Sequence, residues 1–232
     1  MTQEEQQKIA IIPARLGSKR IPKKNIREFC GKPILTRTIE TLIGSEIFSE
    51  VVVSTESEEI AEIAIESGAM VPFLRSQKLA SDDALTVPVI QDAVQRMKLQ
   101  SIDLACCVYP ASPFLTREIL LQSLEKFLSV DDALFGYPVV EYPYPIQRRM
   151  QINSDGITNL SDSTYENFRS QELDKYLHDA SMFYWASVAT WQSGIPLTRN
   201  GATISISRWM QQDINTEEDW EYAEKLFKLN GK

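Results

Sequence analysis

The stretch from Ile9 to Asn25, IAIIPARLGSKRIPKKN, constrains the fold of this chain more than any other. Its four apolar residues, Ile9 to Ile12, predict a short buried strand, and Pro13 ends that strand because proline has no N–H for a sheet ladder. A polar loop follows, and open α/β sheets bind ligands at the carboxyl ends of their strands. Gly17 and Ser18 let backbone N–H groups approach an anion closely. The stretch therefore predicts a polyphosphate cradle.

Basic residues gather in the same region. Eight of them fall between positions 15 and 37 against one acid, Glu28, although the chain has a formal net charge of -8. A solvated basic loop is the alternative interpretation, but the preceding strand and the Gly-Ser step favour a bound anion. Neither GxxxxGK[ST] nor GxGxxG occurs, so a nucleotide would be held differently than in a Walker ATPase or a dinucleotide dehydrogenase. The eight basic residues are Arg15, Lys19, Arg20, Lys23, Lys24, Arg27, Lys32 and Arg37.

Composition narrows the class of protein. With 232 residues, 43% of them hydrophobic, the chain can form one large domain or a domain with an insertion. It has no run of ~18 apolar residues, and its first eight residues, MTQEEQQK, do not resemble a signal peptide, so we expect a cytoplasmic protein without membrane contact. The net charge of -8 argues against nucleic-acid binding. Cys30, Cys106 and Cys107 cannot pair evenly, which predicts reduced, mostly buried thiols.

Strand and helix patterns alternate over the first half of the chain. Helical apolar spacing occurs at residues 33–43 and 87–97, and a further helix at 56–67 begins with acids and stops at Gly68. Strands are predicted at 51–53, 69–74 and 104–109, which indicates a largely parallel sheet with right-handed crossovers. From residue 133 onward, strand patterns at 133–140 and 150–152 without a clean helix predict a β-rich excursion, of a kind that builds dimer contacts or a substrate pocket.

Two further stretches are candidates for the site. The polar loop 75–86, RSQKLASDDALT, follows a predicted strand, although Ser81, Asp82 or Asp83 would alternatively cap the next helix. The strand 104–109 ends beside the first loop in a doubly wound sheet. Tyr109 is therefore either a substrate contact or a buried tyrosine with a satisfied hydroxyl.

Carboxylates gather near the end of the chain. Thr216 with the acids after it predicts a helix start with an ordinary acidic first turn. Asp213 precedes that turn. If its carboxylate faces the cradle, it would suit Mg²⁺, because this ion binds a few protein oxygens together with substrate phosphates. A metal-ligand role and a structural role both remain open for it. His178 is the only histidine, so no zinc set or Ser/His/Asp set can be assigned, whereas the planar fork of Arg169 suits a carboxylate.

Six stretches together resemble the nonulosonic acid cytidylyltransferases, the enzymes that make CMP-activated sialic-type sugars. They are IIPARLGSKRIPKKNI, CGKPIL, VVVSTES, LRSQKLASDDA, YPASPF and DINTEEDW, in this order and over nearly the whole chain. PYPIQRR, FRSQEL and HDASMFYW are most similar to the pseudaminic acid branch. The resemblance implies one domain over residues 1–232, with a Rossmann-like, mixed but mostly parallel sheet of the nucleotide-diphospho-sugar transferase type. It also implies a β-rich dimerisation arm inserted at about 139–180, exchanged in a homodimer, and the use of CTP with Mg²⁺.

The resemblance also assigns roles to residues. Arg15, Gly17, Ser18, Lys24 and Asn25 would hold the triphosphate, with Arg15 and Lys24 neutralising the charge on pyrophosphate. Asp213 would bind the catalytic Mg²⁺. Cytidine would contact Arg75, Ala84 and Thr86, and the sugar pocket would include Tyr109, Gln147, Arg148, Arg169, Gln171, His178, Asp179 and Phe183.

Departures from the family pattern keep alternatives open. Asn215 stands where a second aspartate is usual, which predicts weaker metal affinity, and Ser181 with Met182 replaces the usual residues after HDA. Tyr109 stands where the sialic acid branch has glutamine. The alternatives are CMP-N-acetylneuraminate, CMP-legionaminate or CMP-Kdo synthesis, or a nucleotide-sugar sensor with little or no catalysis. A hexose-1-phosphate nucleotidylyltransferase would need a longer glycine-rich opening, which is missing.

Overall fold

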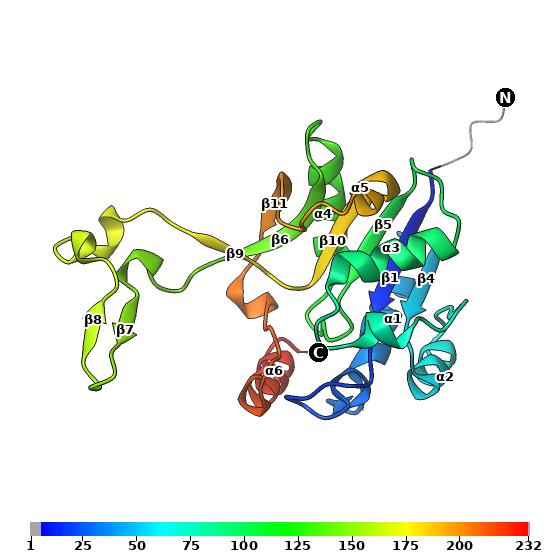
Figure 1. Cartoon of the computed structure of the whole chain (residues 1–232), viewed down its shortest axis with the longest axis horizontal. Coiled ribbons are helices and arrows are strands. Elements are labelled where there is room, and N and C mark those ends of the chain that lie inside the picture. The colour runs from blue at the N-terminus through cyan, green and yellow to red at the C-terminus, as the bar shows by residue number, and fades with distance from the viewer. Residues whose placement is uncertain (1–5, 232) are drawn as a thin grey trace.

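A mixed β-sheet forms the centre of the molecule (Figure 1). The structure is a computed structural model and describes residues 6–231. Residues 1–5 of the polar stretch MTQEEQQK, which argued against a signal peptide, lie outside the described residues. The seven-stranded sheet has the order β11-β6-β10-β5-β1-β4, and β9 pairs with β6. Its strands are β1 (Lys8–Pro13), β4 (Glu50–Ser54), β5 (Leu104–Val108), β6 (Phe135–Glu141), β9 (Leu177–Asp179), β10 (Phe183–Ser187) and β11 (Gly201–Ser205).

The direction of the strands confirms the predicted fold class. β1 is parallel to both β4 and β5, and β11 is parallel to β6. β10 is antiparallel to β5 and β6, and β9 is antiparallel to β6. The sheet is therefore mixed but mostly parallel, and the carboxyl ends of β1, β4 and β5 share one edge, where an α/β sheet binds its ligands.

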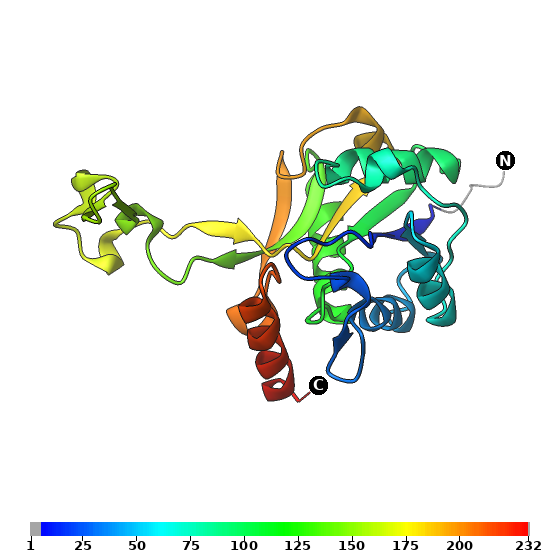
Figure 2. The ribbon, with the colours of Figure 1, turned by 60° about the horizontal axis from the view of Figure 1, so that its bottom comes forward.

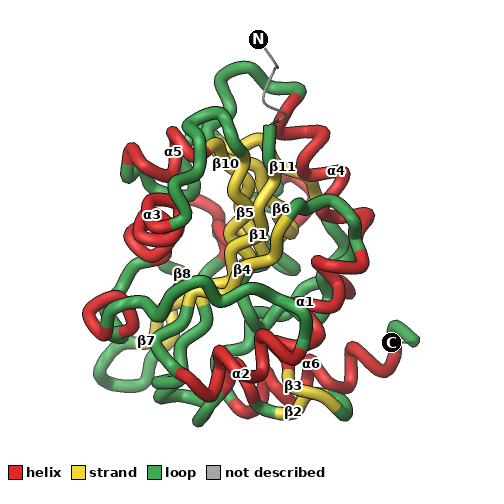
Figure 3. The backbone as a smooth tube through the Cα atoms, turned by 90° about the vertical axis from the view of Figure 1, so that its right-hand side faces the viewer, coloured by secondary structure: helices red, strands yellow, loops and turns green. Residues whose placement is uncertain are grey.

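Helices cover both faces of the sheet (Figure 3). One face packs against α1 (Ile34–Gly44), α2 (Glu58–Glu66), α4 (Arg117–Leu128) and α6 (Glu217–Leu229), the other against α3 (Thr86–Arg96) and α5 (Val188–Ser193). Strand β1 serves both cores, because Ala10 and Ile12 point to the first face and Ile9 and Ile11 to the second. This double burial explains the uninterrupted apolar run with which the strand was predicted. A small ribbon of β2 (Glu28–Phe29) and β3 (Lys32–Pro33) precedes α1.

A side-chain cap begins the last helix where the sequence predicts it. The Thr216 hydroxyl accepts from the Asp219 N–H, and the Asp219 carboxylate accepts from the Thr216 N–H, which is the predicted start of α6. Helix α3 differs, since its N-cap is Leu85 and no side chain caps it. The alternative that Ser81, Asp82 or Asp83 caps this helix is therefore wrong.

The strand predicted at residues 69–74 is not formed. Only two isolated parallel bridges link this segment to the sheet edge, Val52 to Met70 and Thr55 to Leu74. Pro72 lies between them and has no N–H to donate, so a continuous ladder cannot run through the segment. The segment still lies along β4 and delivers Arg75 to the ligand edge, with the Arg75 N–H donating to the Thr55 carbonyl at 2.9 Å.

Residues 142–176 form an arm that projects away from the sheet (Figures 1 and 2). It leaves the end of β6 and returns into β9, and near its tip it carries an antiparallel hairpin of β7 (Met150–Ile152) and β8 (Thr158–Leu160). Short 3-10 turns make up the remainder, at Ile146–Arg148, Ser163–Tyr165 and Ser170–Glu172. The role of the arm in dimerisation, and the single-domain boundaries with an insertion at about 139–180, stay predictions.

The cysteines and the hydropathy pattern agree with the sequence. All three cysteines are free, with Cys106 and Cys107 buried and Cys30 partly exposed. Cys106 and Cys107 face opposite cores, and burial raises the pKa of both thiols above the ordinary range. Within residues 6–231, no helix combines the length and the apolar character that crossing a bilayer requires.

Candidate active site

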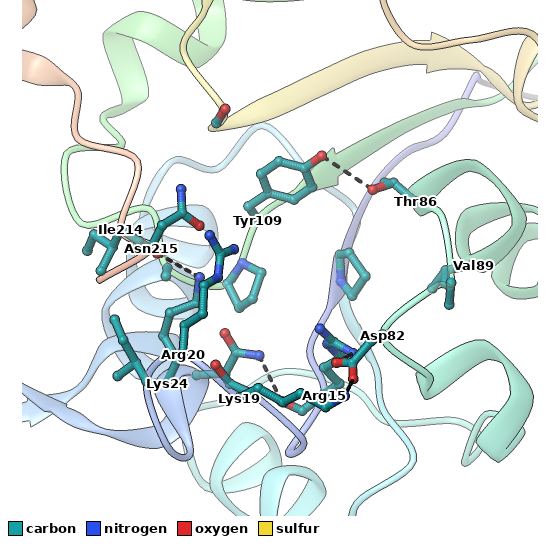
Figure 4. Close-up of a pocket in the computed structure, with 18 of the residues that line it drawn as sticks. Arg15, Lys19, Arg20, Lys24, Asp82, Thr86, Val89, Tyr109, Ile214 and Asn215 are labelled. Atoms are coloured by element: carbon teal, nitrogen blue, oxygen red, sulfur yellow. Dashed lines mark hydrogen bonds and ion pairs between the residues drawn. The ribbon is translucent and has the colours of Figure 1, made fainter. Parts of the chain in front are cut away.

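A cavity of about 650 Å³ opens at the carboxyl ends of β1 and β5. Five segments build it: the end of β1 with the loop after it, the loop before α3 with the start of that helix, the residues following β5, the turn between β9 and β10, and the turn before α6 (Figure 4). Its walls are therefore assembled from both halves of the chain. The lining residues are Pro13, Arg15, Ser18, Lys19, Arg20, Ile21, Lys24, Asn25, Arg75, Leu79, Ser81, Asp82, Ala84, Thr86, Val89, Tyr109, Pro110, Ala111, Ser181, Asp213, Ile214 and Asn215.

Two cations of the basic loop converge on Asp82. Arg15 Nη1 donates to Asp82 Oδ1 at 2.8 Å, and the Lys19 ammonium forms an ion pair with the other carboxylate oxygen. The hydrogen bond from Lys19 and that from Arg15 hold the pKa of Asp82 below its usual range. An internal carboxylate thus occupies the cationic side of the cavity, in the way that a phosphate oxygen would.

Lys24 ties the basic loop to the turn before α6. Its ammonium donates to the Ile214 carbonyl at 2.8 Å, across 190 residues of sequence. Burial lowers the pKa of Lys24, and the charge of Asp213 works against that shift. Asn25 holds two parts of the same loop together, because its Nδ2 donates to the Arg15 carbonyl at 2.9 Å. Among residues 6–231, its Oδ1 is buried without a hydrogen-bond partner.

Arg75 and Glu56 clamp the base of the cavity. Arg75 is 5% exposed, and its Nη2 donates to the Ala14 carbonyl and to Glu56 Oε2, both at 3.2 Å. Glu56 in turn accepts from the Leu16 N–H at 2.8 Å. Burial lowers the pKa of Arg75, and the Glu56 carboxylate opposes the shift. The start of the basic loop, at Ala14 and Leu16, is therefore held by one buried ion pair.

Asp213 and Asn215 form the acidic side of the cavity. Asn215 Nδ2 donates to Asp213 Oδ2 at 2.6 Å, and the Asn215 N–H donates to Asp219 Oδ2 at 3.0 Å. Residues 6–231 contain no cluster of three or more His, Cys, Asp and Glu side chains suited to a metal ion. One carboxylate and one amide oxygen beside a cationic loop fit Mg²⁺ that takes its remaining oxygens from a polyphosphate.

Tyr109 lines the cavity opposite the basic loop. Its hydroxyl is 3.3 Å from Thr86 Oγ1, and its ring meets that of Tyr184 edge-on at 5.9 Å. Burial raises the pKa of Tyr109 to about 12, so the hydroxyl is neutral near pH 7. Behind this wall, Asp179 accepts hydrogen bonds from Tyr184 and from Ser181, which has a left-handed φ of 51°.

The structure divides the predicted site residues into three groups. Those that line the cavity are Arg15, Ser18, Lys24, Asn25, Arg75, Ala84, Thr86, Tyr109 and Asp213. Gly17 lies in the same loop but not on the cavity wall, and a Cβ added there would meet nothing within 4 Å. Phe183 is fully buried in the core, and Asp179 lies behind the wall. The group on the arm or at its base comprises Gln147, Arg148, Arg169, Gln171 and His178.

The arm residues have local contacts within this chain. Gln147 is 5% exposed, and its Nε2 donates to the Asp174 carbonyl at 2.9 Å. This hydrogen bond links the outgoing and the returning segments of the arm. Arg148 reaches Ser170 at 3.4 Å, and His178 packs edge-on against Tyr142 at 4.9 Å. None of the residues predicted on the arm lines the cavity of the same chain.

Several cavity residues were absent from the predicted site. Lys19 and Arg20 were counted in the basic cluster, but nothing in their spacing separated them from Lys23 or Arg27. Asp82 was interpreted only as a helix cap, and Ser181 only as a departure from a pattern. Their place on the wall depends on how the loops fold back over the sheet edge.

Comparison with known proteins agrees with this geometry. The family model described as cytidylyltransferase matches residues 9–230. A pseudaminic acid cytidylyltransferase from Campylobacter jejuni is 38% identical over 96% of this chain and 97% of its own length. A CMP-N,N'-diacetyllegionaminic acid synthase from Legionella pneumophila is 32% identical over 96% of this chain and 97% of its own.

Solved structures show the same fold at lower identity. The structure of a CMP:2-keto-3-deoxy-manno-octonic acid synthetase complexed with CTP superposes with a TM-score of 0.71 and 16% identity, covering 97% of this chain and 99% of that one. A 4-diphosphocytidyl-2C-methyl-D-erythritol synthase gives a TM-score of 0.65 at 12% identity, over 96% and 99%. The resemblance noted in the sequence is confirmed at the level of the family: this chain belongs to the cytidylyltransferases, a family of nucleotidyltransferases.

Proposed function

We propose that this protein transfers CMP from CTP to the anomeric hydroxyl of a nine-carbon 2-keto sugar acid, with pseudaminic acid as the sugar. The observation that carries the proposal is the cavity itself, in which a basic loop faces Asp213 across the carboxyl edge of the sheet. The names of the most similar relatives support the sugar, since two of them act on pseudaminic acid.

The two ends of the cavity suit the two parts of CTP. Thr86, Ala84 and Arg75 lie on the side of α3 and would hold the cytidine. Arg15, Ser18, Lys24 and Asn25 would hold the triphosphate, for which phosphate oxygens must replace the Asp82 carboxylate on Arg15 and Lys19. A phosphate carries more charge than a carboxylate, so the exchange favours the nucleotide.

The reaction requires positioning and charge neutralisation more than a nucleophilic side chain. The sugar hydroxyl attacks the α-phosphorus of CTP in line, the new P–O bond forms, and the bond to pyrophosphate breaks with its electron pair leaving on pyrophosphate. Asp213 accepts the proton of the attacking hydroxyl, and Arg15 and Lys24 neutralise the charge that develops on the leaving group. Mg²⁺ held by Asp213, with the amide oxygen of Asn215, would supply further neutralisation of the phosphates.

We also propose that the arm acts in a homodimer. One face of its hairpin carries Met150 and Ile152, which are 65% and 71% exposed in the single chain, while Gln151 points to the other face. A two-stranded hairpin that leaves its apolar face in water is marginal on its own. A second copy would cover that face, and Arg148 and Arg169 on the arm would then lie beside the partner's sugar pocket.

The experiment that tests the proposal is pyrophosphate release from CTP and Mg²⁺ with one sugar acid at a time. The panel is pseudaminic acid, legionaminic acid, N-acetylneuraminic acid and Kdo, and we expect release with pseudaminic acid to exceed that with the other three. Release with another sugar alone would overturn the sugar assignment but leave the reaction. If no pyrophosphate is released with any of the four sugars while CTP still binds, the nucleotide-sugar sensor would be favoured. The observation that supports this alternative is Asn215 in place of a second carboxylate.

A further inference from the structure

Glu56 is a carboxylate beside the cavity that the proposed reaction does not use. It lies in the turn between β4 and α2, and both of its neighbours along the chain are held in place. The Thr55 carbonyl accepts from the Arg75 N–H at 2.9 Å, and the Ser57 hydroxyl caps α2 by accepting from the Ile60 N–H at 3.3 Å. The Glu56 side chain is only 9% exposed. A carboxylate this deeply buried requires partners for its charge.

The partners of Glu56 come from two different segments of the cavity. Its Oε1 accepts from the Leu16 N–H at 2.8 Å, and its Oε2 accepts from Arg75 Nη2 at 3.2 Å. Leu16 belongs to the loop that carries Arg15 and Ser18, to which the proposed function gives the triphosphate. Arg75 lies on the side to which it gives the cytidine. One carboxylate therefore joins the two parts of the site.

Arg75 keeps a donor for a ligand in spite of these contacts. Its Nη2 donates to Glu56 and to the Ala14 carbonyl, both at 3.2 Å. Among residues 6–231, its Nε is buried without a hydrogen-bond partner. The residue nevertheless lines the cavity, although it is only 5% exposed. Because a buried donor without an acceptor is unfavourable, a ligand that presents an acceptor at this wall is favoured.

The ion pair determines the charge on this side of the cavity. Glu56 and Arg75 carry opposite charges 3.2 Å apart, so together they present hydrogen-bond donors without a net charge. Cytosine is neutral and has acceptors in its carbonyl oxygen and ring nitrogen, whereas a triphosphate is polyanionic. A paired Arg75 therefore suits the base, and the basic loop remains the stronger attraction for the triphosphate.

We propose that Glu56 is a positioning residue for CTP, which holds Arg75 in place for the cytosine ring and cancels the charge that would draw the triphosphate to the same wall. The inference rests on the proposed function for the placement of CTP in the cavity. Glu56 is not among the described residues that line the cavity, so it acts through Arg75 and through the Leu16 N–H.

The test measures Kd by isothermal titration without Mg²⁺ for two probes, CTP and inorganic tripolyphosphate. In Glu56→Gln the amide oxygen can still accept from the Leu16 N–H, but the NH₂ group faces the guanidinium as a second donor, so the link to Arg75 is lost. We expect Kd for CTP to rise about tenfold, and Kd for tripolyphosphate not to rise. Glu58→Gln, which removes an exposed acid from the first turn of α2, is the control and should change neither value.

Two further readouts distinguish positioning from a general loss of structure. In an Arg75→Ala background, Glu56→Gln should not raise Kd for CTP further, because the group through which it acts is absent. In the pyrophosphate assay, Glu56→Gln should raise KM for CTP and leave kcat at saturation close to that of the wild type, because Glu56 touches no reacting atom.

Stability requires a second variant, since removing one partner of a buried ion pair is destabilising. Glu56→Asp keeps the charge but is one methylene shorter, so its Kd for CTP should rise less than that of Glu56→Gln. It gives the same comparison of the two probes if Glu56→Gln does not fold. Thermal unfolding of each variant sets a titration temperature at which the protein is folded.

The possible results separate this role of Glu56 from the proposed function. An equal Kd for CTP in the wild type and in Glu56→Gln, or an equal rise for CTP and tripolyphosphate, would overturn the role and leave the cytidylyl transfer standing. A further rise in the Arg75→Ala background would likewise overturn it, because Glu56 would then act independently of Arg75. A wild type that does not bind CTP would overturn the proposed function and the role of Glu56 with it.

Discussion

Asp213 and Asp82 are two carboxylates of one cavity that face the same cations in different ways. Asp213 lies across the cavity from Arg15 and, among residues 6–231, is bonded only to Asn215 and to its own turn, whereas Asp82 is directly paired with Arg15 and Lys19. Under the proposed function, Asp213 would act on the incoming hydroxyl, while Asp82 would have to be displaced before phosphate could enter. Their replacement should therefore change different kinetic constants.

Asp213→Ala should reduce kcat by about 10²- to 10⁴-fold, the usual range for loss of a general base, while binding of CTP in the absence of Mg²⁺ stays close to that of the wild type. Isothermal titration with CTP and the pyrophosphate assay measure the two effects separately. Asp131→Ala, which removes an exposed carboxylate in the loop after α4, is the matched control and should change neither. Near-normal turnover by Asp213→Ala would contradict the role given to this residue.

Asp82→Asn should bind CTP more tightly than the wild type. Binding no longer requires two ion pairs to be broken, but both are solvent-exposed, so the decrease in Kd should be modest, about two- to fivefold. Asp83→Asn is the control, because Asp83 acts on Lys19 only through space and should have a smaller effect. A weaker affinity for CTP in Asp82→Asn would mean that Asp82 organises the loop for the nucleotide instead of competing with it.

At the scale of elements, the start of α6 supports the turn that carries Asp213. The Asp219 carboxylate accepts from the N–H groups of Asn215 and Thr216 at 3.0 and 2.8 Å, and from the Thr216 hydroxyl at 2.9 Å. The capping box of the helix therefore extends backward into the segment that carries Asp213. Stability of the helix and geometry of the site depend on the same carboxylate.

The contribution of Asp219 should depend on pH in a defined direction. Its pKa lies below the ordinary 3.8, against the effect of burial, because of the hydrogen bonds from Asn215 and Thr216. A depressed pKa means that the stabilisation is complete above the unfolded value and disappears as pH falls through the folded one. Asp219→Asn should thus lower the free energy of unfolding by about 0.5–1 kcal/mol near neutral pH, and the difference should be smaller at a pH below the ordinary 3.8.

Urea unfolding of the wild type and Asp219→Asn at both pH values measures this difference. Glu218→Gln removes a charge from the same helical turn without touching the capping box, and its effect should be smaller and caused by the helix dipole alone. A constant difference between the wild type and Asp219→Asn across this pH range would contradict the assignment of the stabilisation to the ionised carboxylate.

At the scale of the whole molecule, the arm lies apart from the segments that build the cavity. The sheet and its helices bury a core on both faces and build the cavity, while residues 142–176 run away from both (Figure 2). Met150 pairs with Leu160, Gln151 with Asn159 and Ile152 with Thr158, so the hairpin has an apolar face and a polar face. The hairpin would gain stability if its apolar face were covered.

Ile152→Glu should shift the protein from dimer to monomer, because it places a charge on the apolar face of the hairpin that the second copy would cover. Sedimentation velocity over a concentration series measures the distribution. Gln151→Glu adds the same charge one residue away, on the other face, and should remain dimeric. A monomeric wild type at every concentration would contradict the proposed homodimer.

Local patterns determined a large part of this protein from the sequence alone. The run Ile9–Ile12 ended by Pro13 specified the central strand and the loop after it, because burial on both faces and the missing N–H of proline are properties of the segment itself. The capping residues Thr216 and Asp219 specified the start of α6 for the same reason. The basic residues between positions 15 and 37 predicted an anion site after the first strand. The six stretches that resemble the nonulosonic acid cytidylyltransferases predicted the family.

Only the tertiary structure decided which of those residues act together. Lys24 meets Ile214 across 190 positions, and Arg15 meets Asp82 across 67, because sheet order and loop path bring them to one edge. Pro72 lies in the segment 69–74, where hydropathy predicted a strand that is not formed. Gln147 and Arg169 lie on the arm and therefore do not line the cavity of their own chain. Periodicity and caps depend on neighbours within a few residues, whereas a cavity depends on distances between segments far apart in the chain, and those distances are set by how the whole sheet packs.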